Sequence, residues 1–168
     1  MSNDLQFKIS HKVTEDNSSN FTIKPLDRGY GITIGNSLRR ALLTAVPGAA
    51  ITNVKIEGAH HEFSTIDGVT EDVADIIMNL KGVRFHLFES KVEPIFLKVK
   101  GPNAFTAADI QAVSDDFTIL NPDHHITDIA KGKTLEVELR LGIGKGYKSS
   151  EENKLNSSPV GMIPIDSI

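Results

Sequence analysis

The stretch LDRGYGITIGNSLRRALLTAVPG, residues 26–48, carries three glycines within seven residues and then two adjacent arginines. A helical pattern of apolar residues begins at Gly35 and runs over residues 35–46, where a Pro-Gly pair stops it. Gly29, Gly31 and Gly35 therefore precede or begin a helix. Two hypotheses explain such an arrangement: a cradle for a phosphate group, or a turn that starts a helix directed at a protein partner.

The phosphate hypothesis needs a specific spacing that this stretch lacks. A dinucleotide fingerprint is G-x-G-x-x-G with an acidic residue about 20 positions later, whereas the third glycine here comes one residue too late. Neither this stretch nor GIGKGY (residues 142–147) has the Gly-Lys-Ser/Thr ending of a P-loop. We expect Gly29, Gly31 and Gly35 to shape a turn. The alternative is a small nucleotide- or anion-binding enzyme that uses this turn with Arg39 or Arg40.

The helix carries an unusually wide apolar arc. At 100° per residue, its apolar residues span about 200°, roughly twice the stripe of an ordinary surface helix. Arg39 lies inside this arc and Arg40 lies outside it. An arc this wide predicts burial on two sides, against the chain's own sheet and against a partner helix. Burial within its own domain alone remains the alternative. The arc consists of Leu38, Ala41, Leu42, Leu43, Ala45 and Val46.

Composition narrows the function classes. The 168 residues carry a net charge of −4, with 22 acidic and 18 basic side chains, which disfavours direct nucleic-acid binding. The absence of cysteine excludes disulfides, zinc ribbons and thiol catalysis. The chain has no signal-peptide pattern at its start and no apolar run of about 20 residues. We expect a soluble cytoplasmic protein.

Hydrophobic periodicity predicts an α+β chain that is rich in strands. Residues 7–13 and 21–26 alternate as a β-hairpin. Residues 67–82 give the clearest helix, with Thr70 as its cap and Gly82 in the left-handed C-terminal position. Further strands are expected at 51–58, 84–88, 94–101, 117–122, 134–141 and 160–168, a short helix at 106–113, and an exposed, mobile loop at 148–159.

Two long motifs carry a family resemblance. PLDRGYGITIGNSLRRALLTAVPGAAITNVKIEG and HEFSTIDGVTEDVADIIMNLKG closely resemble the N-terminal domain of bacterial RNA polymerase α subunits, and FTAADI, GKGY and PIDSI extend the match. The resemblance implies two lobes: residues 1–47, the hairpin and helix of a dimerisation domain, and residues 48–168, a mostly β inserted domain. The family's returning strand and helix and its DNA-binding domain are absent, so we interpret the sequence as a truncated piece without direct DNA binding.

The resemblance also implies partners and site residues. The family's α subunit is a homodimer on which the β and β′ subunits assemble, and it is a non-catalytic part of a nucleotidyltransferase. Arg40 matches the arginine that docks the β subunit, and Glu62, Ser64 and Thr65 are secondary contacts. The dimer interface is expected at Leu38, Arg39, Leu42, Ala45 and Val46. No catalytic residue, cofactor, metal or membrane contact is expected.

Histidines and paired acids are the remaining candidates for chemistry. His60, His61, His124 and His125 stand in adjacent pairs, and neighbouring residues of a strand point to opposite faces. A metal site needs ligands that converge, so these histidines are interpreted as polar surface positions. The acidic pairs at 115–116 and 151–152 are interpreted as solvated loop residues.

Overall fold

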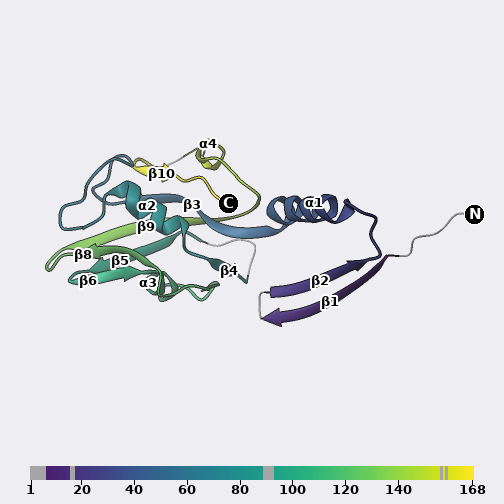
Figure 1. Ribbon diagram of the computed structural model, residues 1–168. Helices are drawn as coiled ribbons and strands as arrows, with labels where there is room; N and C mark the ends of the chain where they lie inside the picture. The colour runs from purple at the N-terminus through teal and green to yellow at the C-terminus, as the bar shows by residue number, and fades with distance from the viewer. Residues whose placement is uncertain (1–6, 16–17, 89–92, 156, 158) are drawn as a thin grey trace, which may run out of the picture. The chain divides into compact units, whose positions relative to one another are not determined.

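The computed structural model describes residues 7–15, 18–88, 93–155, 157 and 159–168 (Figure 1). Two of the regions discussed above lie partly outside this description: the start of the chain (residues 1–6) and the predicted loop (residues 156 and 158). The chain divides into two compact units, residues 1–43 and 44–168. The fold is α+β, and each unit is described by itself below.

The first unit consists of a hairpin and a long helix. Strands β1 (Lys8–Glu15) and β2 (Ser18–Lys24) pair antiparallel, with His11 opposite Phe21 and their rings stacked at 4.8 Å. The helix α1 (Tyr30–Ala45) follows after a turn in which Tyr30 N–H donates to the Asp27 carbonyl at 3.1 Å. The predicted hairpin and helix are therefore present, but the helix starts five residues before the predicted Gly35.

The glycines of the opening stretch have two different roles. Gly29 has φ +94°, a left-handed backbone conformation that favours glycine, and it lies in the turn before α1. Gly31 and Gly35 lie inside α1 without a positive φ. The prediction that these two glycines shape the turn is wrong, because helical hydrogen bonding continues through both.

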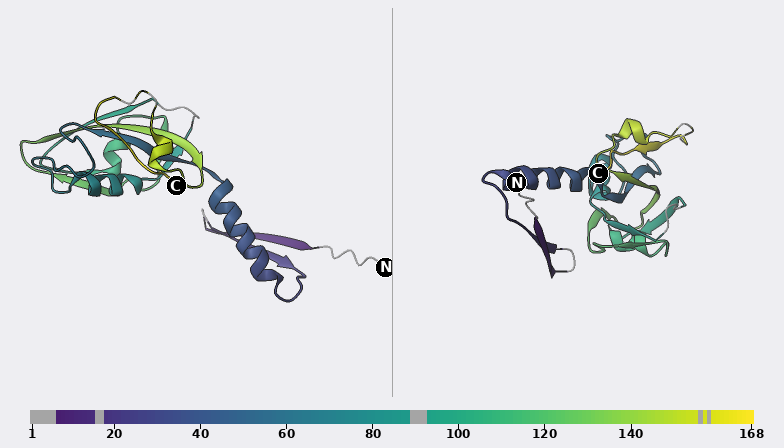
Figure 2. Two further views of the ribbon diagram at one scale, coloured as in Figure 1. Left: turned by 90° about the horizontal axis from the view of Figure 1, so that it is seen from above. Right: turned by 90° about the vertical axis from the view of Figure 1, so that its right-hand side faces the viewer.

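The second unit is built on a six-stranded sheet with the order β5-β9-β3-β4-β7, in which β10 also pairs with β3. A two-stranded sheet, β6-β8, lies beside it in the same unit. In Figure 2 the long strands β3 and β9 run together through this unit. The strands are β3 (Pro47–Ile56), β4 (Phe85–Leu87), β5 (Ile95–Lys100), β6 (Asn103–Thr106), β7 (Phe117–Ile119), β8 (His125–Ile129), β9 (Thr134–Lys145) and β10 (Met162–Pro164).

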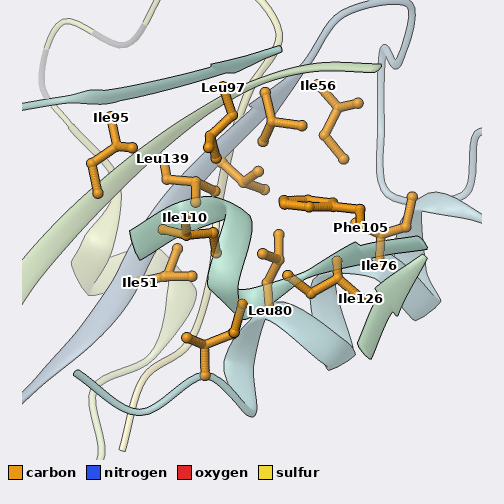
Figure 3. Packing of buried hydrophobic residues seen from close by; sticks show 14 of the residues in the cluster. Ile51, Ile56, Ile76, Leu80, Ile95, Leu97, Phe105, Ile110, Ile126 and Leu139 are labelled. Carbon is orange, nitrogen blue, oxygen red and sulfur yellow. The ribbon is translucent and has the colours of Figure 1, made fainter. Parts of the chain in front are cut away.

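Alternation along β9 and β5 explains the core of this unit. Leu135, Val137 and Leu139 point inward from β9, while Glu136 and Glu138 lie between them on the other face. The helix α2 (Val73–Lys81) contacts β3 and β8 and buries one apolar stripe, as its periodicity predicts. Figure 3 shows how Ile76 of α2 and Leu139 of β9 pack together with Phe105 of β6.

Two details of α2 differ from the prediction. Asp72, not Thr70, caps the helix, because its carboxylate accepts the N–H of Asp75 at 2.8 Å. Gly82 has φ −76° and is therefore not left-handed. A Cβ at Gly82 would lie 2.6 Å from His124 Nε2, so close approach of the His124 ring requires glycine there.

The segment 148–159, expected as a mobile loop, contains the helix α4 (Ser150–Asn153). Asn153 is buried, accepts a hydrogen bond from Asn53 Nδ2 at its carbonyl and donates from Nδ2 to the Ile165 carbonyl at 2.7 Å. These bonds connect α4 to β3 and to the residues after β10. The loop prediction is therefore wrong for α4, because these hydrogen bonds hold Asn153 inside the fold, although its Oδ1 has no hydrogen-bond partner in the described structure. Strands β6 and β8 were not predicted, whereas the helix expected at 106–113 is α3 (Ala107–Gln111).

The start of α4 gives a pH-dependent prediction. Hydrogen bonds from the Ser149 N–H and hydroxyl to the Glu152 carboxylate lower the pKa of Glu152. Because the folded pKa lies below the unfolded one, these bonds stabilise the fold above the unfolded pKa and are lost as pH falls through the folded pKa. A carboxyl NMR titration is expected to show Glu152 below the usual glutamate midpoint. Ser149→Ala should raise that midpoint and Ser150→Ala should not; equal effects of both would contradict the assignment.

Candidate functional site

The helix α1 exposes its apolar arc. None of its 16 residues, all of which the structure describes, is buried. Leu38, Leu42 and Leu43 are 49%, 65% and 61% exposed. Val46, expected in the same arc, follows the end of the helix and is also exposed. Contiguous exposed apolar surface of this kind marks an interaction site in a soluble domain.

Two glycines lie in the centre of this arc. On the helical wheel Gly31 and Gly35 fall about 20° and 60° from Leu38, on either side of Leu42. A Cβ at either glycine would meet no atom within 4 Å in the described structure. Glycine inside a helix destabilises it by about 0.5–1 kcal/mol relative to alanine, and no contact in the described chain requires it here. The pair leaves a flat strip on which another backbone can come close.

The hairpin adds a second exposed apolar face. Ile9 and Val13 point to the same side of β1, and Phe21 faces that side from β2. These three side chains are 67%, 61% and 65% exposed. Every element of the first unit therefore presents apolar surface that the described chain leaves uncovered.

The two arginines lie on different sides of α1. Arg39 falls within the arc and Arg40 about 100° further round, and both are exposed. Arg39 therefore shares a surface with Leu38, Leu42 and Ala45, as the sequence predicts from the helical period. Arg40 shares a helix with them but faces another direction.

The loop that precedes α2 holds the other predicted contacts. Glu62 and Thr65 are exposed, whereas Ser64 is half-buried. The Ser64 hydroxyl lies 3.3 Å from His61 Nδ1, and its carbonyl accepts the Val73 N–H at 3.1 Å. Ser64 thus fixes the loop to the start of α2, whereas the side chains of Glu62 and Thr65 are exposed. The loop belongs to the second unit and Arg40 to the first.

A cluster of ionisable side chains in the second unit was missed by the sequence analysis. Glu71, His125 and Asp128 bring one ligand atom each within 4.8 Å of one another. Burial raises the pKa of Glu71, but hydrogen bonds from the Thr127 hydroxyl and the Asp128 N–H outweigh it and lower the pKa. Elsewhere, a hydrogen bond from Lys133 lowers the pKa of exposed Asp67. His125 and Asp128 are three residues apart, but nothing in the sequence places Glu71 beside them.

The alternative of an anion site at the glycine turn gains no support. The Tyr30 N–H at the helix start is already donated to the Asp27 carbonyl. Asp27 also precedes α1 by only three residues, and a negative charge near this N-terminus disfavours a bound anion. Across the described helices, none is long and apolar enough to cross a membrane.

The family model and the curated relatives that match this chain all belong to RNA polymerases. A family model described as the RNA polymerase Rpb3/RpoA insert domain matches residues 54–168. The chain is 52% identical to the DNA-directed RNA polymerase subunit alpha of Salinibacter ruber over 91% of its own length and 47% of the relative's. It is 46% identical to the alpha subunit of Chloroherpeton thalassium, over 97% of this chain and 52% of the relative. It is 50% identical to the alpha subunit of Limosilactobacillus reuteri, over 94% of this chain and 51% of the relative. The chain thus spans about half the length of these curated relatives.

Proposed function

The chain belongs to the RNA polymerase Rpb3/RpoA family, and on this premise we propose that it is a non-catalytic assembly subunit of a bacterial DNA-directed RNA polymerase. In this proposal two copies pair and form the platform on which the β and β′ subunits assemble for transcription. The chain supplies no catalytic residue to the nucleotidyltransferase reaction and acts in the cytoplasm. Direct contact with DNA is not part of its role.

The observation that carries this proposal is the uncovered apolar surface of the first unit. The arc on α1 and the apolar face of the hairpin are exposed in the described chain. Leu38, Arg39, Leu42, Ala45 and Val46 form the proposed dimer interface. In a two-fold pair the same patch meets itself, and Gly31 and Gly35 then let the two α1 helices approach closely. Close packing of two α1 helices would explain why glycine stands at both positions, since no contact in the described chain requires glycine there.

The proposed division of labour follows the domain interpretation. Residues 1–47 are the N-terminal part of the dimerisation domain, and residues 48–168 are the inserted domain. Arg40 is exposed and faces away from the dimer arc, on the side where a different subunit would dock in the proposed pair. Arg40, Glu62, Ser64 and Thr65 form the proposed docking residues for β, with Ser64 acting through the shape of its loop.

The docking role of Arg40 is tested by Arg40→Ala. We expect the affinity of the chain for the purified β subunit of the same organism to fall at least tenfold, because arginine at the centre of an interface often carries a large share of the binding energy. Biolayer interferometry with immobilised chain measures this affinity. Circular dichroism melting should stay unchanged, because Arg40 is an exposed surface residue.

Arg28→Ala is the matched control, since Arg28 is also exposed and lies in the same unit. It should bind β as the unaltered chain does. If Arg40→Ala binds β with unchanged affinity, Arg40 is not a docking residue. If the unaltered chain does not bind β at all, the assembly function itself is refuted.

A further inference from the structure

Three potential metal ligands from distant parts of the sequence meet at one edge of the second unit. Glu71 precedes α2, whereas His125 and Asp128 lie on β8. Glu71 Oε1 is 3.9 Å from His125 Nδ1, and Asp128 Oδ2 is 3.4 Å from His125 Nε2. The fold therefore places one imidazole between two carboxylates.

The Glu71 carboxylate is fixed by groups that are not ligands. Its Oε2 accepts hydrogen bonds from the buried Thr127 hydroxyl and from the Asp128 N–H, the latter at 3.0 Å. These bonds leave Oε1 directed at His125. Metal ligands in proteins are commonly oriented by such outer hydrogen bonds, which raise affinity for the ion.

The charge of the cluster is not balanced by lysine or arginine. Across the described residues, the ion pairs of Glu71 and Asp128 involve His125 alone. With the imidazole neutral, which is the form that can bind a metal, the three side chains carry a formal charge of −2. Two partly exposed carboxylates held this close favour a divalent cation.

We propose that Glu71, His125 and Asp128 form a binding site for a divalent transition-metal ion of the zinc class. Imidazole selects such ions over magnesium and calcium, which prefer oxygen ligands throughout. Bonds of about 2.0–2.1 Å in a tetrahedral arrangement place ligand atoms about 3.3 Å apart. Asp128 Oδ2 and His125 Nε2, 3.4 Å apart, already meet this spacing. Glu71 Oε1 lies nearer the other ring nitrogen, Nδ1, so the exposed His125 ring must turn for one nitrogen to meet both carboxylates at the ion. Water completes the coordination.

Ion binding would join the segment before α2 to β8. This segment and β8 already share the Thr70 N–H to Asp128 carbonyl bond at 3.0 Å. Together with the two hydrogen bonds that Glu71 accepts from β8, this bond already connects the two elements, and a metal adds a further connection that exists only when the ion is bound. The site lies in the second unit and does not depend on the proposed assembly function.

Isothermal titration calorimetry of the whole 168-residue chain with zinc chloride, after treatment with a chelator, tests the site. We expect one equivalent of zinc to bind and magnesium to produce no heat under the same conditions. His125→Ala and Asp128→Asn should each weaken zinc binding at least tenfold. Thr127→Val, which removes no ligand, should also weaken it about tenfold by releasing Glu71.

His60→Ala is the control, because His60 is exposed and lies outside the cluster. It should leave the affinity for zinc unchanged, and zinc should shift the NMR signals of the His125 ring. Should Thr127→Val misfold, His125→Ala and Asp128→Asn, whose side chains are largely exposed, still test the site. Equal zinc affinities for His125→Ala and the unaltered chain, or loss of binding with His60→Ala, would overturn the proposal.

Discussion

Leu42→Asp is expected to convert a self-associating chain into a monomer, with a loss of at least 100-fold in the association constant. On the helical wheel Leu42 falls between Gly31 and Gly35, near the centre of the apolar arc. Its side chain is 65% exposed in the single chain. In a two-fold pair the substitution places two carboxylates in the same apolar contact. Burying unpaired charge there opposes association strongly. Sedimentation velocity over a range of concentrations measures the association constant.

The same substitution should not disturb the folded chain. Exposed positions generally tolerate substitution within about 0.5 kcal/mol. Thr33→Asp is the matched control, since Thr33 is an exposed α1 residue about 220° from Leu38 on the wheel, outside the arc. It adds the same charge and should leave self-association intact. A Leu42→Asp chain that still associates, or a Thr33→Asp chain that dissociates equally, would exclude the arc as the interface.

The parts of the fold that sequence predicts well are those with a strict local period. The alternation over residues 134–141 places Leu135, Val137 and Leu139 in the core, as predicted. The stripe over 73–80 likewise identifies the buried face of α2. In both elements the side chains repeat with the geometry of the backbone, so that the sequence alone reveals the buried face.

Other features depend on contacts that no local period records. Gly31 and Gly35 suggest a turn by composition, yet both lie inside α1. Gly82 is glycine because the ring of His124, 42 positions later, lies against it. Asn153 belongs to a polar segment and is buried, since Asn53 and the Ile165 carbonyl supply its partners.

Of the two candidate sites, one can be predicted from a local period in the sequence and the other cannot. The apolar arc on α1 is a property of one helix, so the period alone brings Leu38, Arg39 and Leu42 together. The cluster of Glu71, His125 and Asp128 depends on β8 lying beside the start of α2. That neighbourhood is set by the tertiary fold, and the sequence therefore gives no local signal for it.

Phe105→Ala is expected to lower the free energy of unfolding of the second unit by about 3–5 kcal/mol. Phe105 on β6 is 0% exposed and packs among aliphatic side chains in the core (Figure 3). Removing its ring leaves a cavity that neighbouring strands and helices fill only in part. Urea unfolding followed by circular dichroism should show a lower midpoint at an unchanged slope.

Phe96→Ala is the control for Phe105→Ala, because Phe96 on β5 is 66% exposed and should shift the midpoint only slightly. Among the described residues, the core cluster runs from Ile51 to Ile165 and includes none from α1. Phe105→Ala should therefore weaken folding without changing self-association under native conditions, and Leu42→Asp should do the reverse. If either variant changes both properties, the folding of the second unit depends on the pairing of the first, and the core and the interface are not separable.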